Sequence, residues 1–549
     1  MAEQTLHSIA FPTLTESQIS DVTRCASVTS RLYRNGETLF AVGDRDFKFF
    51  IIQSGEVEIV DHSGDTPRTI TVHRPGGFTG DVSHLTGNPA IVSAVARGVC
   101  EVYEIPGHAL RAILNQCPTL SDIILQAFIA RRQLLRESPD FIGLRVIGSR
   151  YSADTFRVRD FLAKNRVLFT WVDVEIDPQV DLLLKEFGLT EADTPVVACA
   201  QLLLLRNPSN AALADAIGIR QPLDQTVYDL VVVGGGPAGL AAAVYGASEG
   251  LRTAVLERTA PGGQAGSSMR IENYLGFPTG VTGSDLTDRA ILQANKFGAR
   301  LSVPTSVVRL TWENGYSILQ LDDGTVLTTK CLLIATGAEY RRLGVEGCEG
   351  FEGKGVYYAA TPAEAKMCQG ADVVVVGGGN SAGQAAVFLA QHSRHVSIVI
   401  RGDDLHKNMS SYLVRRIQQT SNIDLLTNST IRRMGGNGHL DSVEIVDHKS
   451  GHERTVETPA LFSFIGAVPR TDWLPPQIER DAEGFIRTGA AMGQSPHWET
   501  GRQPFLLETS CPGVFAAGDV RSGSSKRVAA AVGEGAMAVQ LVHEYLKQM

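Results

Sequence analysis

The sequence predicts a multidomain chain in which an antiparallel β-roll and a small α/β domain precede two parallel α/β units, one inserted into the other. Three observations indicate this architecture. Short strand-like runs separated by glycine turns fill residues 1–135, and strand-like and helix-like runs alternate over residues 136–223. Two glycine-rich strand–turn–helix segments then begin at Tyr228 and Val373. By length, 549 residues suffice for about three or four domains.

Composition argues against nucleic-acid and membrane partners. The formal net charge is −9, and the opening MAEQTLHSIAF has neither a basic nor an apolar signal-peptide segment. No apolar run reaches the roughly 18 residues that cross a bilayer. The eight cysteines are scattered and no two form C-x-x-C, so no zinc-ribbon or vicinal redox motif is present and no metal site is expected. We therefore expect a cytoplasmic protein.

The first part of the chain has the pattern of a small antiparallel roll. Thr15 and Gln18 have the spacing of a capping box, which predicts a short first helix. Alternation over Val57–Val60 and Thr69–Val72 predicts strands, and an amphipathic run over Gln116–Arg131 predicts a closing helix.

The stretch Gly36–Ala96 resembles a cyclic-nucleotide-binding domain in its glycines and in the segment FTGDVSHLTGNPAIVSAVA. The phosphate-binding segment of that family carries Gly-Glu and then an arginine that neutralises the cyclic phosphate. Here Asp81 replaces the glutamate, Ala90 occupies the arginine position, and no Arg or Lys lies between Arg74 and Arg97. Because burying an unpaired phosphate is costly, a structural or regulatory roll is favoured over cyclic-nucleotide binding.

Residues 136–223 are predicted to form strands and helices in the order β-α-β-α-β. The predicted runs are Leu144–Gly148, Ala153–Lys164, Leu168–Val174, Val180–Phe187 and Val196–Ala200. With a Thr194-Pro195 step before the last strand, this order resembles a thioredoxin or glutaredoxin fold, in which a cis proline faces the redox cysteines. The C-x-x-C of that family falls near Arg150–Asp154, which holds no cysteine, and Cys199 is alone. A docking or spacer role is expected, with Asn207–Leu223 as a connection.

The segment YDLVVVGGGPAGLAAAVYGASEG predicts a dinucleotide-binding unit. Its strand, Leu230–Val233, runs into G-x-G-x-x-G, and Leu240–Ala247 predicts the helix. The glycines allow a tight turn, a close approach of pyrophosphate and close helix packing, and the helix N-terminus favours an anion. A second strand, Arg252–Leu256, ends at Glu257, about 20 residues after the first glycine, where a ribose-binding carboxylate belongs.

A second unit of the same kind follows. Val373–Val376 predicts its strand, a G-x-G-x-x-A turn comes next, and Ser381–Gln391 predicts its helix. The next strand, Val396–Ile400, ends in Arg401 and not in an acid. Since an arginine pairs with a 2′-phosphate that a carboxylate would repel, NADPH is favoured over NADH.

A third short strand, in GVFAAGD, ends at Asp519, whose carboxylate suits ribityl hydroxyls, and a helix over Arg527–Glu544 follows. This return after the second unit implies nesting. The expected limits are 1–135 for the roll, 136–223 for the small α/β domain, 224–344 with 467–549 for the FAD domain, and 345–466 for the NAD(P)H domain.

From about residue 226 to its end the chain resembles bacterial thioredoxin reductase. The matching stretches are VVGGGPAGLAAAVY, PGGQ, IENYLGFP, LLIATGAEYRRL, VVVVGGGNSAGQAAVFLA, FSFIGAVPRT, GVFAAGDV and KRVAAAVGEGAMA. The resemblance implies FAD and NADPH as cofactors and a homodimer. For FAD we expect contacts from Gly234, Gly236, Pro237, Ala238, Gly239, Glu257, Arg258, Gly263, Gln264, Asn273, Thr336, Gly337, Gly518, Asp519, Arg527, Val528 and Ala529. For NADPH we expect contacts from Gly377, Gly379, Asn380, Ser381, Arg401 and His406.

The redox segment departs from that family. Its C-A-T-C and following Asp correspond to GVYYAATPA, where the cysteine positions hold Ala359 and Pro362 and the acid is Ala363. Without a thiolate nothing can attack the flavin or relay electrons to a disulfide, so we assign no catalytic residue. Cys368 is single. The basic pair for the 2′-phosphate is also reduced to Arg401, which predicts a weaker NADPH preference.

We therefore predict an FAD-dependent NAD(P)H oxidoreductase that passes electrons directly to a quinone-like molecule, to oxygen or to a one-electron protein. Tyr357 and Tyr358 either shield the flavin or pack in the core. Two alternatives stay open. One is a thioredoxin-disulfide reductase that uses distant cysteines, such as Cys368, or the cysteines of a partner. The other is a flavin-based redox sensor, against which the intact second unit argues because a sensor has no use for it.

Overall fold

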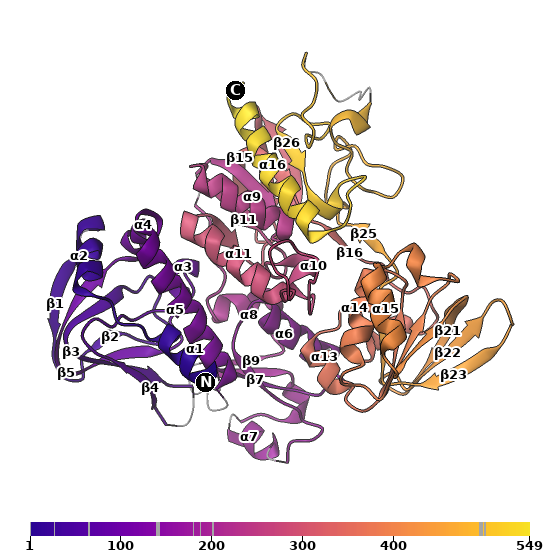
Figure 1. Ribbon diagram of the computed structural model, residues 1–549, viewed down its shortest axis with the longest axis horizontal. Helices are drawn as coiled ribbons and strands as arrows, with labels where there is room; N and C mark the ends of the chain where they lie inside the picture. The colour runs from indigo at the N-terminus through magenta and orange to yellow at the C-terminus, as the bar shows by residue number, and fades with distance from the viewer. Residues whose placement is uncertain are drawn as a thin grey trace.

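The chain forms several separate β-sheets, which are built from different parts of the sequence (Figure 1). The structure is a computed structural model. It describes residues 2–26, 28–63, 66–138, 143–178, 180–186, 188–199, 203–224, 226–493, 498 and 501–549. None of the helices formed by these residues combines the length and the apolar character that spanning a bilayer requires.

The N-terminal sheet is an antiparallel roll of order β1-β5-β3-β4, with β2 paired to β5. Its strands are β1 (Thr29–Tyr33), β2 (Thr38–Phe40), β3 (Phe49–Asp61), β4 (Arg68–His73) and β5 (Ser93–Ile105). Its helices are α1 (Ala2–Ala10), α2 (Glu16–Cys25), α3 (Ser83–Thr86), α4 (Gly107–Gln116) and α5 (Pro118–Glu137). The capping box of Thr15 and Gln18 is confirmed at α2. The predicted closing helix was wrong at its start, because Cys117 has non-helical dihedrals and Pro118 begins α5.

The middle domain has a four-stranded sheet of order β7-β6-β8-β9. Its strands are β6 (Leu144–Ile147), β7 (Phe169–Val172), β8 (Val196–Cys199) and β9 (Leu203–Arg206); its helices are α6 (Ala153–Lys164), α7 (Val180–Glu186), η1 (Glu191–Asp193) and α8 (Asn210–Ala216). The Thr194-Pro195 bond is cis, as expected. The prediction of a plain connection over Asn207–Leu223 was wrong, because Ser209 caps α8 there by accepting from the Ala212 N–H.

The FAD-domain sheet has the order β12-β11-β10-β15-β14-β13, and β26 returns from the end of the chain to pair with β15. Its strands are β10 (Tyr228–Val233), β11 (Thr253–Leu256), β12 (Arg300–Ser302), β13 (Val307–Glu313), β14 (Tyr316–Leu321), β15 (Val326–Ile334) and β26 (Val514–Ala516). The helices of this part are α9 (Pro237–Ser248), α10 (Gly263–Gly266), α11 (Gly283–Phe297), η3 (Gly489–Met492), η4 (Gly518–Val520) and α16 (Val528–Leu546).

The nucleotide-domain sheet has the order β17-β24-β18-β19-β20, beside a three-stranded sheet β21-β22-β23. Its strands are β17 (Val356–Tyr357), β18 (Asp372–Val376), β19 (His395–Val399), β20 (Ile423–Leu426), β21 (Ser429–Gly435), β22 (Ser442–Asp447), β23 (Glu453–Glu457) and β24 (Ala460–Ser463). Its helices are α12 (Cys348–Phe351), α13 (Pro362–Met367), α14 (Asn380–Leu389), η2 (Leu405–Lys407) and α15 (Ser411–Gln419). β16 (Ala338–Tyr340) and β25 (Ala467–Pro469) pair antiparallel where the chain leaves and re-enters the FAD domain.

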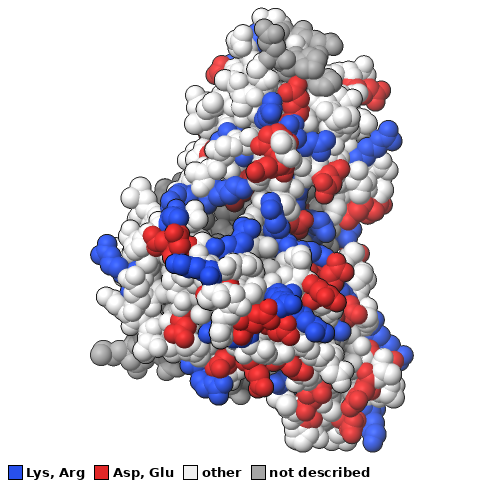
Figure 2. All heavy atoms as spheres, turned by 90° about the vertical axis from the view of Figure 1, so that its right-hand side faces the viewer, with Lys and Arg blue, Asp and Glu red and all other residues white. Residues whose placement is uncertain are grey.

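Lys, Arg, Asp and Glu side chains are interspersed over the face that carries the nucleotide domain (Figure 2).

Candidate cofactor sites

The first glycine turn has one open position between two crowded ones. A Cβ at Gly234 (φ +110°) would lie 2.2 Å from the Ala335 oxygen, and a Cβ at Gly239 would lie 1.9 Å from the Gly234 oxygen. At Gly236 the nearest described atom beyond its chain neighbours would be the Gly263 Cα, at 3.9 Å. α9 starts beside this gap, and no described side chain caps it. Its first N–H groups can therefore receive an anion.

Glu257 follows β11 and lies against the same turn. Its carboxylate accepts hydrogen bonds from the Gly235 N–H at 2.7 Å and the Thr259 N–H at 2.9 Å. These bonds orient the carboxylate at the strand end, where it can accept further donors from a ribose. Arg258, the next residue, is exposed.

The loop after Glu257 packs on the glycine turn. The Gly262 N–H donates to the Gly235 oxygen at 2.7 Å. Gln264 donates from Nε2 to the Ala338 oxygen, 2.5 Å away, so in this structure its amide is bonded to backbone. Thr336 donates to the Arg470 oxygen at 3.0 Å, and Gly337 has a positive φ. Asn273 is exposed.

A second helix N-terminus comes from the end of the chain. α16 begins at Val528, after Arg527, and no described side chain caps it. α16 packs tightly on α9, since a Cβ at Gly535 would lie 2.1 Å from the Ala238 oxygen. Burial raises the pKa of Asp519, and the Lys526 cation opposes that rise. Asp519 is thus a half-buried carboxylate, and its neighbour Gly518 lies against α9, because a Cβ at Gly518 would be 3.0 Å from the Ala238 Cβ.

The nucleotide-domain turn repeats this geometry. A Cβ at Gly377 (φ +139°) would lie 2.4 Å from the Phe464 oxygen, whereas no described atom lies within 4 Å of a Cβ built at Gly379. Asn380 opens α14 and accepts from the Ser410 N–H at 2.8 Å. Arg401 and His406 are both exposed, and both follow β19 on the edge where the turn lies.

Tyr340 links the two turns, and sequence reasoning missed it. Burial raises the pKa of this phenol, a hydrogen bond with Ser381 opposes the rise, and the Asp519 charge adds to it. Its ring also meets Phe464 edge-on at 5.4 Å between centroids. One side chain on β16 therefore faces both the start of α14 and the Asp519 end of the FAD domain. Tyr340 lies three residues after the predicted Gly337, and it carried no signal of its own in the sequence.

The redox-segment tyrosines have packing roles. Tyr357 is buried in the nucleotide-domain core, 5.5 Å from Phe462 between ring centroids. Tyr358 donates to Glu352 at 2.8 Å. Of the two readings of these tyrosines, the contacts match core packing and not flavin shielding.

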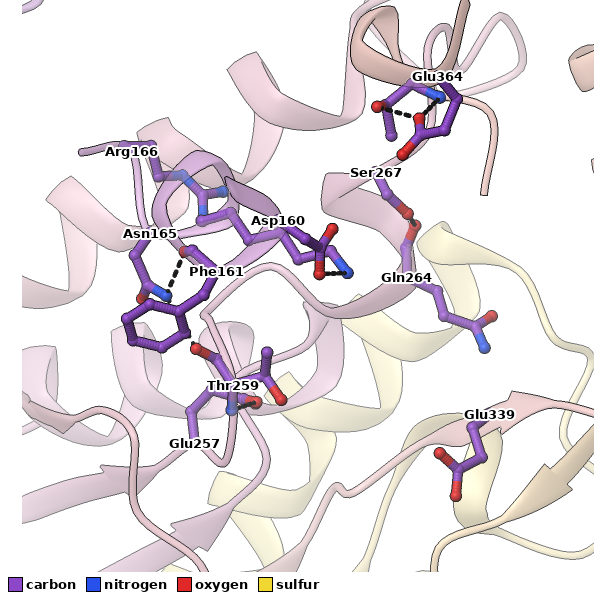
Figure 3. Close-up of polar contacts among 12 residues, drawn as sticks. Asp160, Phe161, Asn165, Arg166, Glu257, Thr259, Gln264, Ser267, Glu339 and Glu364 are labelled. Atoms are coloured by element: carbon purple, nitrogen blue, oxygen red, sulfur yellow. Dashed lines mark hydrogen bonds and ion pairs between the residues drawn. The ribbon is translucent and has the colours of Figure 1, made fainter. Parts of the chain in front are cut away.

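Helix α6 of the middle domain joins both parts of the reductase. At its C-terminal end, Asn165 lies beside Thr259 (Figure 3) and donates to the Thr259 oxygen at 2.9 Å. At its N-terminal end, the Phe156 ring lies 5.7 Å from the Tyr357 ring, and a Cβ at Gly353 would lie 3.8 Å from the Ala153 Cα. The N-terminal end of α6 is where the thioredoxin resemblance places its cysteines. This end therefore covers the segment where the reductase resemblance places its own cysteines.

The cysteines of residues 224–549 are poor nucleophiles. These four residues, Cys331, Cys348, Cys368 and Cys511, are all buried. Burial raises the pKa of each thiol, to about 12 for Cys368 and Cys511. A raised pKa leaves little thiolate at neutral pH.

One close thiol pair lies in the N-terminal domain, and it was missed. The Cys25 and Cys117 sulfurs are 2.8 Å apart although 92 positions separate them. No spacing motif could have indicated this contact.

Comparison with known proteins supports this architecture. Residues 228–535 match the family model of pyridine nucleotide-disulphide oxidoreductases, and residues 30–117 match that of cyclic nucleotide-binding domains. Thioredoxin reductase of Bacillus subtilis is 32% identical over 327 residues, covering 59% of this chain and 97% of that protein. The Treponema pallidum enzyme is 34% identical over 323 residues, covering 59% and 98%. Lactococcus lactis thioredoxin reductase in its FR conformation superposes with a TM-score of 0.53 at 28% identity, covering 59% and 100%. The predicted fold class and both terminal resemblances are confirmed.

Proposed function

Because the chain belongs to the pyridine nucleotide-disulphide oxidoreductase family, as a thioredoxin reductase-like FAD-dependent NAD(P)H oxidoreductase, we propose that it reduces its acceptor without a redox-active disulfide. Ala359 and Pro362 at the two cysteine positions carry this proposal. A disulfide route needs a thiolate at each end, and neither residue supplies one.

The residues present fit both nucleotides. Gly236 and Gly379 leave room for a pyrophosphate at two uncapped helix starts, and Glu257 and Asp519 offer carboxylates for hydroxyl groups. Bound FAD supplies hydride and one-electron chemistry that amino-acid side chains lack. The protein's own part is to bind, orient and exclude water, and the half-buried Tyr340 fits this role between the two sites. The individual cofactor contacts expected from the sequence remain proposals that these geometries support.

Other cysteines do not replace the missing pair. The four thiols of the reductase part are buried with raised pKa values, Cys368 among them. The Phe156 ring also covers the redox segment at Tyr357. An acceptor therefore takes electrons from the flavin itself, and a quinone, oxygen or a one-electron protein fits this route.

The test is anaerobic mixing of the holoenzyme with NADPH in a stopped-flow spectrophotometer, followed by an acceptor screen. We expect the flavin band to bleach, and menadione, oxygen or ferricyanide to restore it. The disulfide dye DTNB is expected to fail, equally in wild type and in Cys368→Ser. Rapid DTNB turnover that Cys368→Ser abolishes would refute the disulfide-free route. Absence of bleaching with both NADPH and NADH would refute the hydride step.

A homodimer is also part of this proposal. Tyr245 on α9 and Met537 on α16 are exposed by 45% and 41% and line the same surface hollow. An apolar pair on adjacent helices suits a symmetric contact. Sedimentation velocity should show a dimer for wild type and a monomer for Met537→Glu.

The domain limits stated above, 1–135, 136–223, 224–344 with 467–549, and 345–466, are proposed as well. The grouping of strands into separate sheets supports them.

A further inference from the structure

A cavity of about 270 Å³ lies inside the N-terminal domain, between the roll, α1 and α5. Three phenyl rings line it, from Phe11, Phe40 and Phe47. Aliphatic side chains complete most of the wall, from Ile59, Ile70, Ile91, Val92, Leu134 and Leu135. The Phe40 and Phe47 rings lie 4.7 Å apart between centroids. The wall is thus suited to a flat apolar molecule that stacks on or meets these rings edge-on.

The deepest cation of the wall, Arg131, already has partners. It donates from Nε to the Ala10 oxygen at 2.7 Å, and from its two terminal nitrogens to the Gly80 and Phe78 oxygens at 2.6 and 2.9 Å. Burial lowers the pKa of this guanidinium to about 9, while the Asp81 charge raises it. Three of its five N–H groups are thus already bonded to backbone carbonyl oxygens.

The other ionisable groups of the wall do not favour a phosphate either. Asp81 accepts from the Ser83 N–H at 2.9 Å and pairs with Arg132 at 3.4 Å. Arg68, at the cavity mouth, pairs with Asp61 at 3.8 Å. Burial, helped by the Arg131 charge, lowers the pKa of His73 well below its usual value, so this imidazole is neutral at pH 7. His7 is exposed beside the Phe11 ring.

We propose that this cavity binds an uncharged, flat aromatic molecule. Binding of this molecule alters the FAD loop through Arg132 and Arg166. Ala90 lines the cavity where the resembling family has a phosphate-binding arginine. Asp81, which stands where that family has a glutamate, is paired with Arg132. The ligand therefore lacks the charged phosphate of a cyclic nucleotide.

A short series of hydrogen bonds leads from the cavity wall to the FAD loop. Arg132 pairs with the wall residue Asp81 and donates to the Arg166 oxygen at 3.1 Å. Arg166 in turn donates to the Pro261 oxygen at 2.7 Å and to Thr287 at 2.8 Å. Pro261 begins the loop that packs on the first glycine turn. A ligand that moves α5 or Asp81 must shift this hydrogen-bond network, because the network connects the cavity wall to the FAD loop.

The binding test uses the full-length holoenzyme and the uncharged fluorescent probe N-phenyl-1-naphthylamine. We expect a saturable rise in probe fluorescence that cyclic AMP and cyclic GMP do not reverse. Thr71 lines the cavity, so Thr71→Trp should weaken binding at least tenfold, whereas Val72→Trp on the same strand, outside the wall, should not. Ile91→Trp is the second filling variant, and circular dichroism verifies that each folds. Binding that survives both filling variants, or displacement of the probe by either cyclic nucleotide, would overturn the assignment.

The coupling test follows flavin fluorescence excited in the visible, where the probe does not absorb. Saturating probe should change flavin emission in wild type. In Arg132→Met the probe should still bind within about twofold, but the flavin change should be lost. A flavin response that is absent in wild type or unchanged in Arg132→Met would refute the coupling. Neither measurement uses NADPH or an acceptor, so failure here is distinct from failure of the proposed reductase function.

Discussion

Replacing Gly236 by Ala should separate FAD binding from folding. The new Cβ meets no described atom closer than 3.9 Å, and φ at this position is −75°, which alanine adopts freely. The methyl group instead fills the gap in front of the N–H groups of α9. Losing one or two charge-assisted hydrogen bonds, at about 1.5–3 kcal/mol each, predicts roughly 100-fold weaker FAD binding.

The matched control is Gly239→Ala. Its Cβ would lie 1.9 Å from the Gly234 oxygen, so the strand and helix must separate, at about 1–3 kcal/mol of unfolding free energy. Apoprotein should be prepared from both variants, unfolded in urea and titrated with FAD by flavin fluorescence quenching. We expect Gly236→Ala to unfold like wild type but bind poorly, and Gly239→Ala to unfold early. Wild-type FAD affinity in Gly236→Ala would refute placement of the pyrophosphate on this turn.

Three further outcomes follow from single sites. Arg401→Ala should raise KM for NADPH by about tenfold and leave KM for NADH unchanged, since the exposed guanidinium pairs only with a 2′-phosphate; equal changes with both nucleotides would contradict this role. Diamide should oxidise Cys25 and Cys117 to a disulfide, because their sulfurs are 2.8 Å apart. The number of thiols counted with DTNB in urea should then fall by two. Cys25→Ser should prevent this loss and Cys199→Ser should not. Burial raises the pKa of Asp519, so its ionisation opposes folding, and that cost appears as pH rises through the folded pKa. Asp519→Asn should therefore stabilise the apoprotein at pH 7 but not at pH 3, while weakening FAD binding.

Local chemistry explains what was predictable from sequence. Both glycine turns were found because a tight turn, a close approach and a close packing contact each exclude a side chain at fixed spacing. Gly234 and Gly377 indeed have backbone oxygens where a Cβ would be. α8 was missed because its seven residues are too few to show a period, and only the Ser209 cap marked its start.

Contacts between distant segments left no such pattern. Tyr340 acquires its position only when β16 pairs with β25, more than 100 residues later. Cys25 and Cys117 meet because α2 packs beside the α4–α5 junction. These contacts depend on tertiary packing, which periodicity and spacing do not encode.

The absence of both C-x-x-C motifs, one in the middle domain and one in the reductase part, has a single structural consequence at α6. Just before α6, Tyr151 stacks on His439 at 4.5 Å between ring centroids; within α6, Phe156 contacts Tyr357; and the C-terminal end of α6 contacts Thr259 through Asn165. If either segment exchanged disulfides with a partner, this contact would have to open in every cycle, breaking apolar packing at one end and the FAD-loop bond at the other. With no cysteine on either side, it can stay closed. A closed contact fixes α6 as a brace between the FAD loop and the nucleotide domain, which agrees with the proposed route in which the acceptor takes electrons from the flavin.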